Sequence, residues 1–314
     1  MKQVPLYFPP INKLGNVAFR RVCNLSGADF VFTEMIRVEK ILEDEEHQLK
    51  KLQIPEDMRD KTIVQIICED ISLIEKGVKK VVELSQNIFE INYNMGCPQS
   101  SLAKQECGGG IVSNSQKVED VARALNKACN KFGVEASIKI RIGLTRDDIT
   151  IYENVKRIRD AGIKKVYIHG RVLRDGYNRP ATYEEIAKVK NLFSDMLIIG
   201  NGDVKDSDSL NRMLKQTNCD GVLVGRAALE NPYVFRELKT GNVEIDSQGV
   251  ALKERLVMIL EFLNYAKQEE ISLSHAKANI TYMTKSVIGG SEFRFGVNNC
   301  LNYDELIDFC QNFK

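Results

Sequence analysis

The chain alternates between short apolar runs and longer polar segments in which apolar residues recur every three or four positions. Apolar runs flanked by charged segments with helical spacing are typical of parallel strands that are buried on both faces. This pattern predicts eight strands, at Val4–Phe8, Phe30–Glu34, Ile63–Ile67, Phe89–Asn94, Ser137–Ile142, Lys165–His169, Met196–Gly200 and Gly221–Val224. The segments between them predict amphipathic helices, at Leu73–Leu84, Lys117–Phe132, Ile149–Ala161, Tyr183–Leu192 and Ser207–Gln216.

Eight strand-and-helix units within about 230 residues predict an α/β fold, a TIM (β/α)8 barrel, with an open doubly wound sheet as the alternative. The pattern changes after Asn231-Pro232, where Leu252–Lys267 and Ser274–Val287 have helical spacing and no further strand is predicted. We therefore expect the barrel to be followed by a small C-terminal helical domain.

The polar segment Asn242–Gly249 has the composition of a link between domains. It places the barrel domain at residues 1–242 and the helical domain at residues 248–314. From Asp246 to Lys314 the chain has 7 basic and 9 acidic residues, and the whole chain has a net charge of +1. Proteins that bind nucleic acid usually present an excess of basic residues, so any such surface here has to form in space rather than along the sequence.

The composition is that of a globular protein with a sizeable core, since 43% of the 314 residues are hydrophobic and 28% are charged. No stretch approaches the roughly 18 uninterrupted apolar residues that a membrane helix needs. The segment Met1–Pro5 has no apolar signal core. We therefore expect a cytoplasmic protein without a membrane partner. We also expect a monomer, although the sequence does not determine the oligomeric state.

The eight cysteines are isolated and never form a C-x-x-C pair, which argues against a disulfide scaffold. No pair of histidines completes a zinc site, so we expect no metal. Most of the cysteines are interpreted as small buried hydrophobic residues. They are Cys23, Cys68, Cys97, Cys107, Cys129, Cys219, Cys300 and Cys310.

Cys97 is the exception, because it follows the fourth predicted strand in Asn94-Met95-Gly96-Cys97-Pro98. Functional groups of a TIM barrel gather where its strands end. A thiol held between Gly96 and Pro98, next to the glycine-rich Gly108-Gly109-Gly110, can point into the barrel mouth and act as an acid. The alternative is a buried cysteine in a turn.

The fifth predicted strand carries two cations, Lys139 and Arg141, on the same face. Unpaired charges inside a barrel are costly, so they need an anionic partner. The edge of a flavin ring, which is negative when reduced, would serve, and a salt bridge to a barrel carboxylate such as Glu34 is the alternative. His169 ends the sixth strand, before Gly170-Arg171, and we expect it near a cofactor, while His47 and His275 are interpreted as surface residues.

Glycine-rich turns follow the last two strands, at Gly200-Asn201-Gly202-Asp203 and at Gly225-Arg226. Backbone N–H groups in such turns form the usual phosphate site of this fold. No G-x-G-x-x-G follows the first strand, so a Rossmann dinucleotide site is not supported. Gln65, on the third strand, has an amide able to bind a ring edge, or it is a polar residue satisfied inside the barrel.

These residues resemble the dihydrouridine synthase family, flavoenzymes that reduce uridines in tRNA, and the resemblance spans nearly the whole chain. The segments that carry it are Phe8–Asn12 with Ala18–Arg21, Thr33–Met35, the N-x-G-C-P motif at Asn94–Pro98, His169–Arg171, Gly176-Tyr177, Pro180-Ala181, Asn201–Asp203 and Gly225–Leu229. Five positions depart from the usual pattern of the family, at Pro9, Ile11, Lys13, Asn92 and Ser101.

The resemblance implies an FMN cofactor, NADPH as the reductant and tRNA as the substrate. It implies FMN contacts from Pro10, Ile11, Asn12, Gln65, Lys139, His169, Asn201, Gly202, Asp203, Gly225 and Arg226. It makes Cys97 the catalytic acid, which protonates C5 of the uracil after hydride reaches C6 from flavin N5. Substrate contacts are expected from Asn94, Arg141, Arg171 and Tyr177, and from Lys277 and Arg294 in the helical domain. Two alternatives stay open, an FMN barrel reductase of a free pyrimidine and a tRNA-binding protein without flavin.

Overall fold

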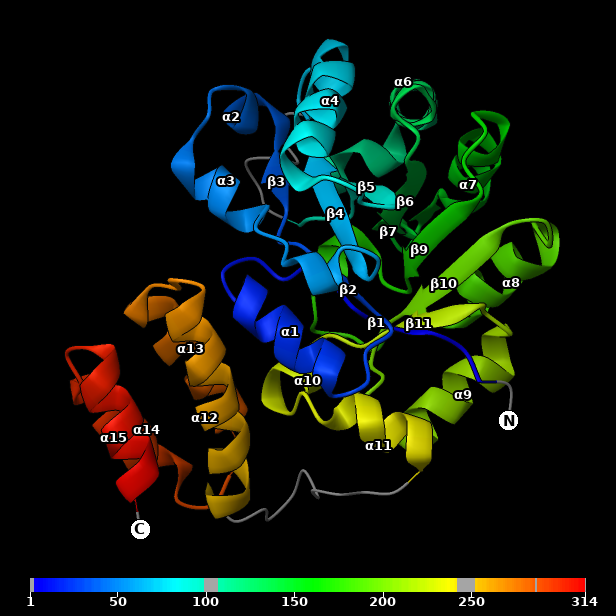
Figure 1. Cartoon of the computed structure of the whole chain (residues 1–314). Coiled ribbons are helices and arrows are strands. Elements are labelled where there is room, and N and C mark those ends of the chain that lie inside the picture. Colours follow the sequence, from blue (N-terminus) through cyan, green and yellow to red (C-terminus); the bar gives the residue numbers. More distant parts are fainter. Residues whose placement is uncertain (1–2, 99–106, 242–251, 286, 314) are drawn as a thin grey trace.

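The computed structural model describes residues 3–98, 107–241, 252–285 and 287–313. Eight parallel strands close into a barrel, because β1 pairs with both β2 and β11, and β2 pairs with β4 (Figure 1). The TIM barrel prediction is therefore confirmed, and the open sheet is wrong. The barrel strands are β1 (Leu6–Phe8), β2 (Phe30–Phe32), β4 (Thr62–Ile67), β5 (Glu90–Met95), β6 (Glu135–Arg141), β9 (Lys165–His169), β10 (Leu197–Asn201) and β11 (Gly221–Leu223).

All five helices predicted between the strands are present, and their ends agree with the prediction to within two residues. They are α4 (Ile74–Ser85), α6 (Ser115–Phe132), α7 (Ile151–Asp160), α8 (Glu184–Leu192) and α9 (Ser207–Thr217). Side-chain caps define several ends. Asn114 caps the start of α6, Gly133 ends it in the left-handed conformation, and Asp206 forms a capping box with Ser209 on α9.

The sequence analysis did not predict several further elements, most of which are too short to show a period; α1 is an exception, because it has nine residues and a clear apolar face. The helices among them are α1 (Val17–Leu25), α2 (Val38–Leu42), α3 (Glu46–Lys51), α10 (Arg226–Glu230) and α11 (Val234–Thr240), and the 3₁₀ turns are η1 (Glu56–Met58), η2 (Ile71–Leu73), η3 (Gly108–Ser113) and η4 (Leu173–Asp175). The short strands are β3 (Ile36–Arg37), which pairs with β4 beyond the end of β2, and β7 (Gly143–Thr145) and β8 (Asp148–Ile149), which form a hairpin.

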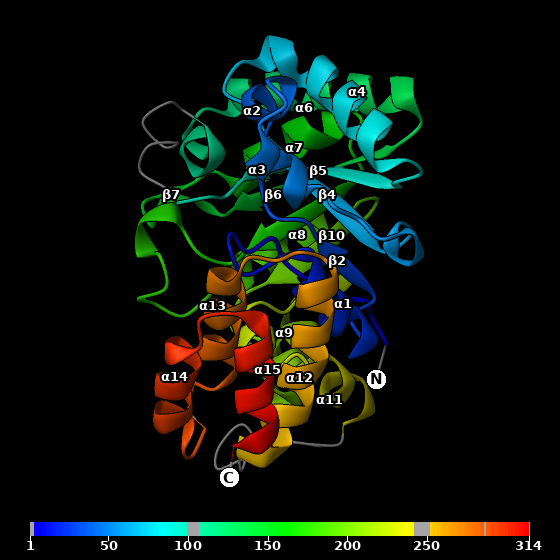
Figure 2. The ribbon, with the colours of Figure 1, turned by 60° about the vertical axis from the view of Figure 1, so that its left-hand side comes forward.

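Of the four C-terminal helices that the structure describes, the first two lie against α1 and α10, and the last two pack on these on the side away from the barrel, as Figures 1 and 2 show. They are α12 (Leu252–Gln268), α13 (Leu273–Met283), α14 (Gly290–Asn299) and α15 (Tyr303–Asn312). The expected helical segment after the barrel is thus present, although α13 ends before the predicted Val287. The link Asn242–Gly249 lies outside the described residues, and the division at residues 242 and 248 stays a prediction.

Buried contacts fix these helices to the barrel. The Asn279 amide donates to the Leu14 carbonyl oxygen at 2.9 Å and accepts from the Asn16 amide at 2.8 Å. The rings of Phe19 and Phe262 meet edge to face, 6.1 Å between centroids. Because α1 begins at the same Asn16 cap, the helical part and the barrel share one packed and hydrogen-bonded boundary.

The inside of the barrel has an apolar floor beneath a polar mouth. The floor is a cluster of inward-facing side chains from six strands, Tyr7, Phe32, Ile63, Tyr167, Ile199 and Leu223. Toward the C-terminal ends of the strands, the same alternation presents polar groups, among them Gln65, Asn94, Lys139 and His169. The fold therefore collects the chemistry at one end, as this architecture usually does.

Candidate active site

The strand order places the two key turns on opposite sides of the barrel mouth. Around the closed ring the order is β1, β2, β4, β5, β6, β9, β10, β11, so β5 and β11 are four strands apart in either direction. Cys97 follows β5, and Gly225 follows β11. The thiol-bearing turn and the last glycine turn therefore face each other across the opening.

Cys97 is the one cysteine of the chain that is not buried. The side-chain oxygen of Asn94 accepts hydrogen bonds from the N–H groups of Gly96 and Cys97, each at 2.9 Å. The Cys97 carbonyl oxygen accepts from the N–H of Gly109 at 3.0 Å. This turn holds the thiol at the barrel mouth rather than in the packed core; its catalytic role stays a prediction.

Arg141 supports the same turn from the neighbouring strand. Its Nε donates to the Gly96 carbonyl oxygen at 2.8 Å, and its Nη1 donates to the Val172 carbonyl oxygen at 3.2 Å. The side chain is almost fully buried, with 2% exposed. Arg141, predicted to contact substrate, thus joins the Cys97 turn to the segment after β9.

Lys139 lies beside Asn94 in the register of β5 and β6, and it is partly exposed. Among the described residues, no hydrogen bond or ion pair reaches its ammonium group, and Glu34 instead accepts from the N–H of Lys13. The alternative of a Lys139–Glu34 salt bridge therefore does not form. Burial, followed by the charge of Arg141, lowers the pKa of Lys139 to about 8.

His169, Arg171 and Asp203 form a hydrogen-bonded row after β9 and β10. Arg171 donates from Nη1 to Nε2 of His169 at 3.1 Å and from Nη2 to both oxygens of Asp203, at 2.5 and 2.6 Å. Burial, followed by Lys139 and the nearby arginines, lowers the pKa of His169 well below its usual range. The ring is therefore neutral, and because its Nε2 accepts, the proton is on Nδ1.

Asp203 also accepts from Arg226 at 2.5 Å and from the N–H of Ala181 at 2.8 Å. Burial raises the pKa of Asp203, but the hydrogen bonds from Arg171 and Ala181 and the charge of Arg226 outweigh it, and the pKa falls below its usual range. The ring of Tyr177, 59% exposed, lies 4.6 Å from the Arg226 guanidinium. Asp203 therefore holds the turns after β10 and β11 together.

The two glycine turns are closely packed. Gly202 has φ 145°, and a Cβ there would lie 2.4 Å from Cβ of Ala181. A Cβ at Gly225 would lie 3.2 Å from Cγ of Pro9, which shows that the turn after β1 packs on the turn after β11. In the turn after β1, Pro10 and Ile11 are half-buried and Asn12 is exposed. In the turn after β10, the side chain of Asn201 donates to the Leu223 carbonyl oxygen at 3.4 Å.

Gln65 is fully buried, and its side chain bonds to two other amides. Nε2 donates to Oδ1 of Asn92 at 2.8 Å, and Oε1 accepts from Nδ2 of Asn94 at 2.7 Å. The interpretation of Gln65 as a polar residue satisfied inside the barrel agrees with these bonds. Its contact with a cofactor stays a prediction.

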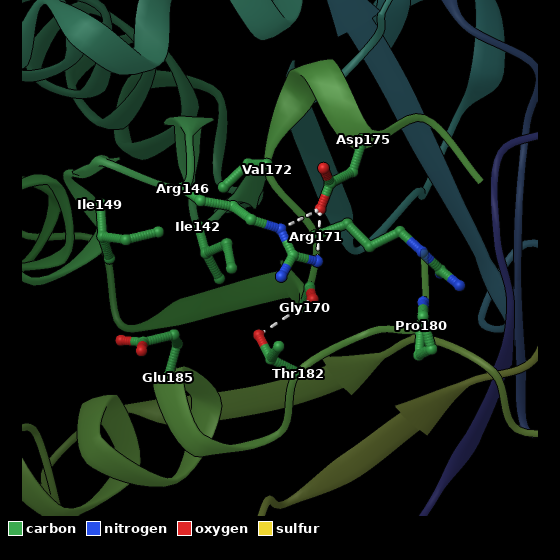
Figure 3. Close-up of a pocket in the computed structure, with 10 residues that line it drawn as sticks. All are labelled: Ile142, Arg146, Ile149, Gly170, Arg171, Val172, Asp175, Pro180, Thr182 and Glu185. Atoms are coloured by element: carbon green, nitrogen blue, oxygen red, sulfur yellow. Dashed lines mark hydrogen bonds and ion pairs between the residues drawn. The ribbon is translucent and has the colours of Figure 1, made fainter. Parts of the chain in front are cut away.

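A small cavity of about 180 Å³ lies on the outer side of the His169–Arg171 turn. Figure 3 shows Arg146 and Asp175 pointing toward each other there, with Nε and Oδ2 3.0 Å apart. This pair fixes η4, which leads into Tyr177, to the β7–β8 hairpin. The lining residues are Ile142, Arg146, Ile149, Gly170, Arg171, Val172, Asp175, Pro180, Thr182 and Glu185.

The two cations predicted to contact substrate from the helical domain lie far along the chain from this site and are bound to backbone carbonyls. Lys277 donates to the carbonyl oxygens of Asn298 and Cys300, at 2.9 and 2.5 Å, at the C-terminal end of α14. Arg294 donates to the carbonyl oxygen of Thr284 at 2.7 Å. Both side chains thus form hydrogen bonds within the C-terminal helices.

The sequence analysis assigned no role to the polar residues below the mouth. Asn92 and Glu90 share the inward face of β5 with Asn94, and Ser137 lies next to Asn92 on β6. Alternation along the strand indicates the shared face. The pairing of Asn92 with Gln65 and Ser137 depends on the register between strands, which the sequence does not contain.

The fold and the site define a (β/α)8 barrel with a cationic mouth and one accessible thiol beside it. The profile of the family described as dihydrouridine synthase (Dus) matches residues 8–314. The chain therefore belongs to the dihydrouridine synthase family and is an enzyme of that family.

Similar proteins and structures are consistent with this membership. The chain is 29% identical over 309 residues to a probable tRNA-dihydrouridine synthase of Aquifex aeolicus, covering 98% of this chain and 95% of that protein. It is 28% identical over 304 residues to tRNA-dihydrouridine synthase B of Pseudomonas aeruginosa, covering 95% and 89%. A histamine dehydrogenase from Rhizobium sp. 4-9 has the same fold, with a TM-score of 0.59 at 12% identity over 83% of this chain and 48% of that chain.

Within the described residues, no helix combines the length and the apolar character that a membrane crossing requires. The same part of the chain holds no group of three or more His, Cys, Asp or Glu side chains suited to a metal ion.

Proposed function

We propose that this enzyme uses FMN and NADPH to reduce specific uridines of tRNA to 5,6-dihydrouridine. The observation that carries the proposal is that Cys97 is not buried and that its turn lies opposite the Gly225 turn in the strand order of a dihydrouridine synthase barrel. The names of the relatives from Aquifex and Pseudomonas support tRNA as the substrate. A monomeric state and a cytoplasmic location remain predictions.

The charges at the mouth fit an anionic cofactor. Lys139 has no anionic partner among the described residues, and Arg171 and Arg226 share the single carboxylate of Asp203. A phosphate at the turns after β10 and β11 would meet N–H groups and the exposed Arg226. The residues proposed to hold the phosphate end of FMN are therefore Asn201, Gly202, Asp203, Gly225 and Arg226.

The flavin ring would be held by the remaining predicted contacts, Pro10, Ile11, Asn12, Gln65, Lys139 and His169. The ammonium of Lys139 is placed to stabilise negative charge on a ring edge. Neutral His169 offers a ring N–H donor without adding a charge. When bound, FMN supplies the hydride for C6 of the uracil, having received it from NADPH.

Cys97 completes the reaction by donating its proton to C5 of the uracil. Its turn keeps the thiol accessible, because Asn94, Gly109 and Arg141 bind the surrounding backbone. A general acid must lie within hydrogen-bond reach of the atom that it protonates. The uridine therefore has to leave its stack in the RNA and enter the mouth between the two opposed turns.

RNA contacts are proposed at two levels. Asn94, Arg141, Arg171 and Tyr177 lie around the mouth, and the exposed ring of Tyr177 offers a face for stacking. In the helical domain, Lys277 and Arg294 are the candidates for RNA contact. Some of their N–H groups already bind backbone carbonyl oxygens, and the others would bind RNA phosphate.

The direct test is to incubate the purified, FMN-loaded protein and NADPH with tRNA that lacks dihydrouridine, and to map the product by mass spectrometry. The proposal predicts addition of one H2 at specific uridines and little reaction with free uracil or orotate. Reduction of the free bases at rates matching tRNA would instead favour the reductase of a free pyrimidine. Failure of the protein to take up FMN would favour the tRNA-binding protein without flavin.

A further inference from the structure

A chain of side-chain hydrogen bonds runs down the inside of the barrel from the mouth to the floor. Nδ2 of Asn94 donates to Oε1 of Gln65 at 2.7 Å, and Nε2 of Gln65 donates to Oδ1 of Asn92 at 2.8 Å. Nδ2 of Asn92 donates to Oγ of Ser137 at 2.7 Å, and Ser137 donates to Oε1 of Glu90 at 2.6 Å. We call these five residues the barrel relay.

Both ends of the barrel relay have a fixed polarity. At the mouth, the oxygen of Asn94 accepts from two backbone N–H groups, those of Gly96 and Cys97, and such groups only donate. At the floor, the carboxylate of Glu90 accepts from Nζ of Lys165 at 2.7 Å and from the hydroxyl of Tyr167 at 2.8 Å. Because donors and acceptors cannot exchange roles at either end, the side-chain amide of each residue between them has a single orientation.

The interior members of the barrel relay are sealed from water. Gln65, Asn92, Ser137 and Glu90 are each 0% exposed. In such an environment a hydrogen bond is strong, and an unmade one has no water to replace it. Removing the hydroxyl of Ser137 would leave a buried N–H of Asn92 without its acceptor and Glu90 without one donor.

We propose that Asn92 and Ser137 are positioning residues, which orient the amides of Gln65 and Asn94 and thereby fix the backbone at Cys97. Within the described residues, neither positioning residue forms a hydrogen bond with Cys97 itself, and both act through Gln65 and Asn94. The inference rests on the proposed function, in which Cys97 is the acid. It assigns a role to two buried residues of β5 and β6 that reactions at the mouth do not touch.

The first test measures the thiol without RNA. Cys97 is the one cysteine that is not buried, so alkylation by iodoacetamide, followed by mass spectrometry, reports on its turn. We expect Ser137→Ala to increase the alkylation rate of Cys97 about fivefold. The loss of one hydrogen bond in a buried network should loosen the turn that holds Cys97. Ser137→Thr retains the hydroxyl and should restore the wild-type rate.

The matched control removes a buried hydroxyl that has no role in the barrel relay. Oγ1 of Thr62 on β4 is buried and has no hydrogen-bond partner among the described residues. Thr62→Val should therefore leave the alkylation rate within about twofold of wild type, since no hydrogen bond is lost. If Thr62→Val and Ser137→Ala increase the alkylation rate of Cys97 by similar factors, the increase comes from general loosening of the barrel, and the proposal is overturned.

The second test separates the two halves of catalysis in single-turnover experiments. Ser137→Ala should form dihydrouridine about tenfold more slowly, because this half-reaction uses the Cys97 proton. Reduction of FMN by NADPH should slow less, since it does not use that proton and Gln65 is the one member of the barrel relay proposed to contact the flavin. If Ser137→Ala does not fold at 25 °C, Ser137→Cys replaces it. A thiol is a weak donor and a weak acceptor, so this variant is expected to act in the same direction with a smaller change.

The outcomes distinguish this inference from the proposed function. A wild-type protein that forms no dihydrouridine contradicts the function, yet a faster alkylation in Ser137→Ala would still establish the positioning role. Alkylation and both half-reactions at wild-type rates in folded Ser137→Ala would overturn the inference and leave the function standing.

Discussion

Lys139 and Arg141 lie two positions apart on the inward face of β6, and neither forms an ion pair with a described carboxylate. Arg141 is bound to two backbone carbonyls, whereas the ammonium of Lys139 has no hydrogen-bond partner in the described part of the chain. The pair makes the barrel mouth cationic and leaves one charge ready for a ligand.

Replacing Lys139 by Ala should weaken binding of reduced FMN by about 10- to 100-fold, because a hydrogen bond to a charged group contributes about 1.5–3 kcal/mol. Oxidised FMN should lose less affinity, since its ring carries no negative charge. Anaerobic fluorescence titration measures both constants. Lys127→Ala, on the exposed face of α6, is the control, and equal affinities for Lys139→Ala and wild type would reject the charge-partner role.

The same lysine predicts a pH dependence. Its pKa is lowered to about 8, so the ammonium is charged below that pH and loses its proton as the pH rises through it. An anionic ligand favours the charged form, and its affinity should therefore fall above about pH 8 rather than near the usual pKa of lysine, about 10.4. Titration of reduced FMN between about pH 6 and 10 tests this. Lys139→Met should remove the decline, and a decline that persists in Lys139→Met would assign it to another group.

Asp203→Asn should destabilise the barrel by about 2 kcal/mol, because it removes the charged acceptor of the buried Arg171 guanidinium while the partly exposed site lets water replace some of the loss. Urea denaturation gives the change in the free energy of unfolding. Asp195→Asn is the matched control, since its pair with Arg159 is exposed and should change stability by less than about 0.5 kcal/mol. Equal changes in the free energy of unfolding for the two substitutions would mean that the Arg171–Asp203 pair stabilises the barrel no more than a surface pair does.

Gly202→Ala should weaken FMN binding and lower stability, because φ is 145° and the new methyl group would lie 2.4 Å from Cβ of Ala181. The backbone strain costs about 1–3 kcal/mol. Ala181→Gly in the same chain should recover part of the loss, since it removes the clash but not the strain. Thermal unfolding and FMN titration of the single and double variants check this; absence of any recovery would contradict the packing described for this turn.

The sequence predicted the barrel well because its strands are short, largely apolar runs and most of its helices are long enough to show a period. The candidate residues at the strand ends could also be predicted from the sequence, because the C-terminal ends of parallel strands meet at one rim of the barrel. The barrel relay was not predictable, because the pairing of Gln65 with Asn92 depends on the register of β4 and β5. The contacts of Lys277 with the carbonyl oxygens at the end of α14 were not predictable either, because they depend on how α13 packs on α14.

The most direct test of the account is a single-turnover comparison of Cys97→Ala with wild type, using FMN-loaded protein, NADPH and tRNA lacking dihydrouridine. Cys300→Ala, which alters a buried cysteine of the helical part, is the control. The account predicts that Cys97→Ala binds FMN and reduces it at the wild-type rate but forms dihydrouridine at least about 100-fold more slowly, the lower range for loss of a general acid. Dihydrouridine formation at the wild-type rate in Cys97→Ala would contradict it.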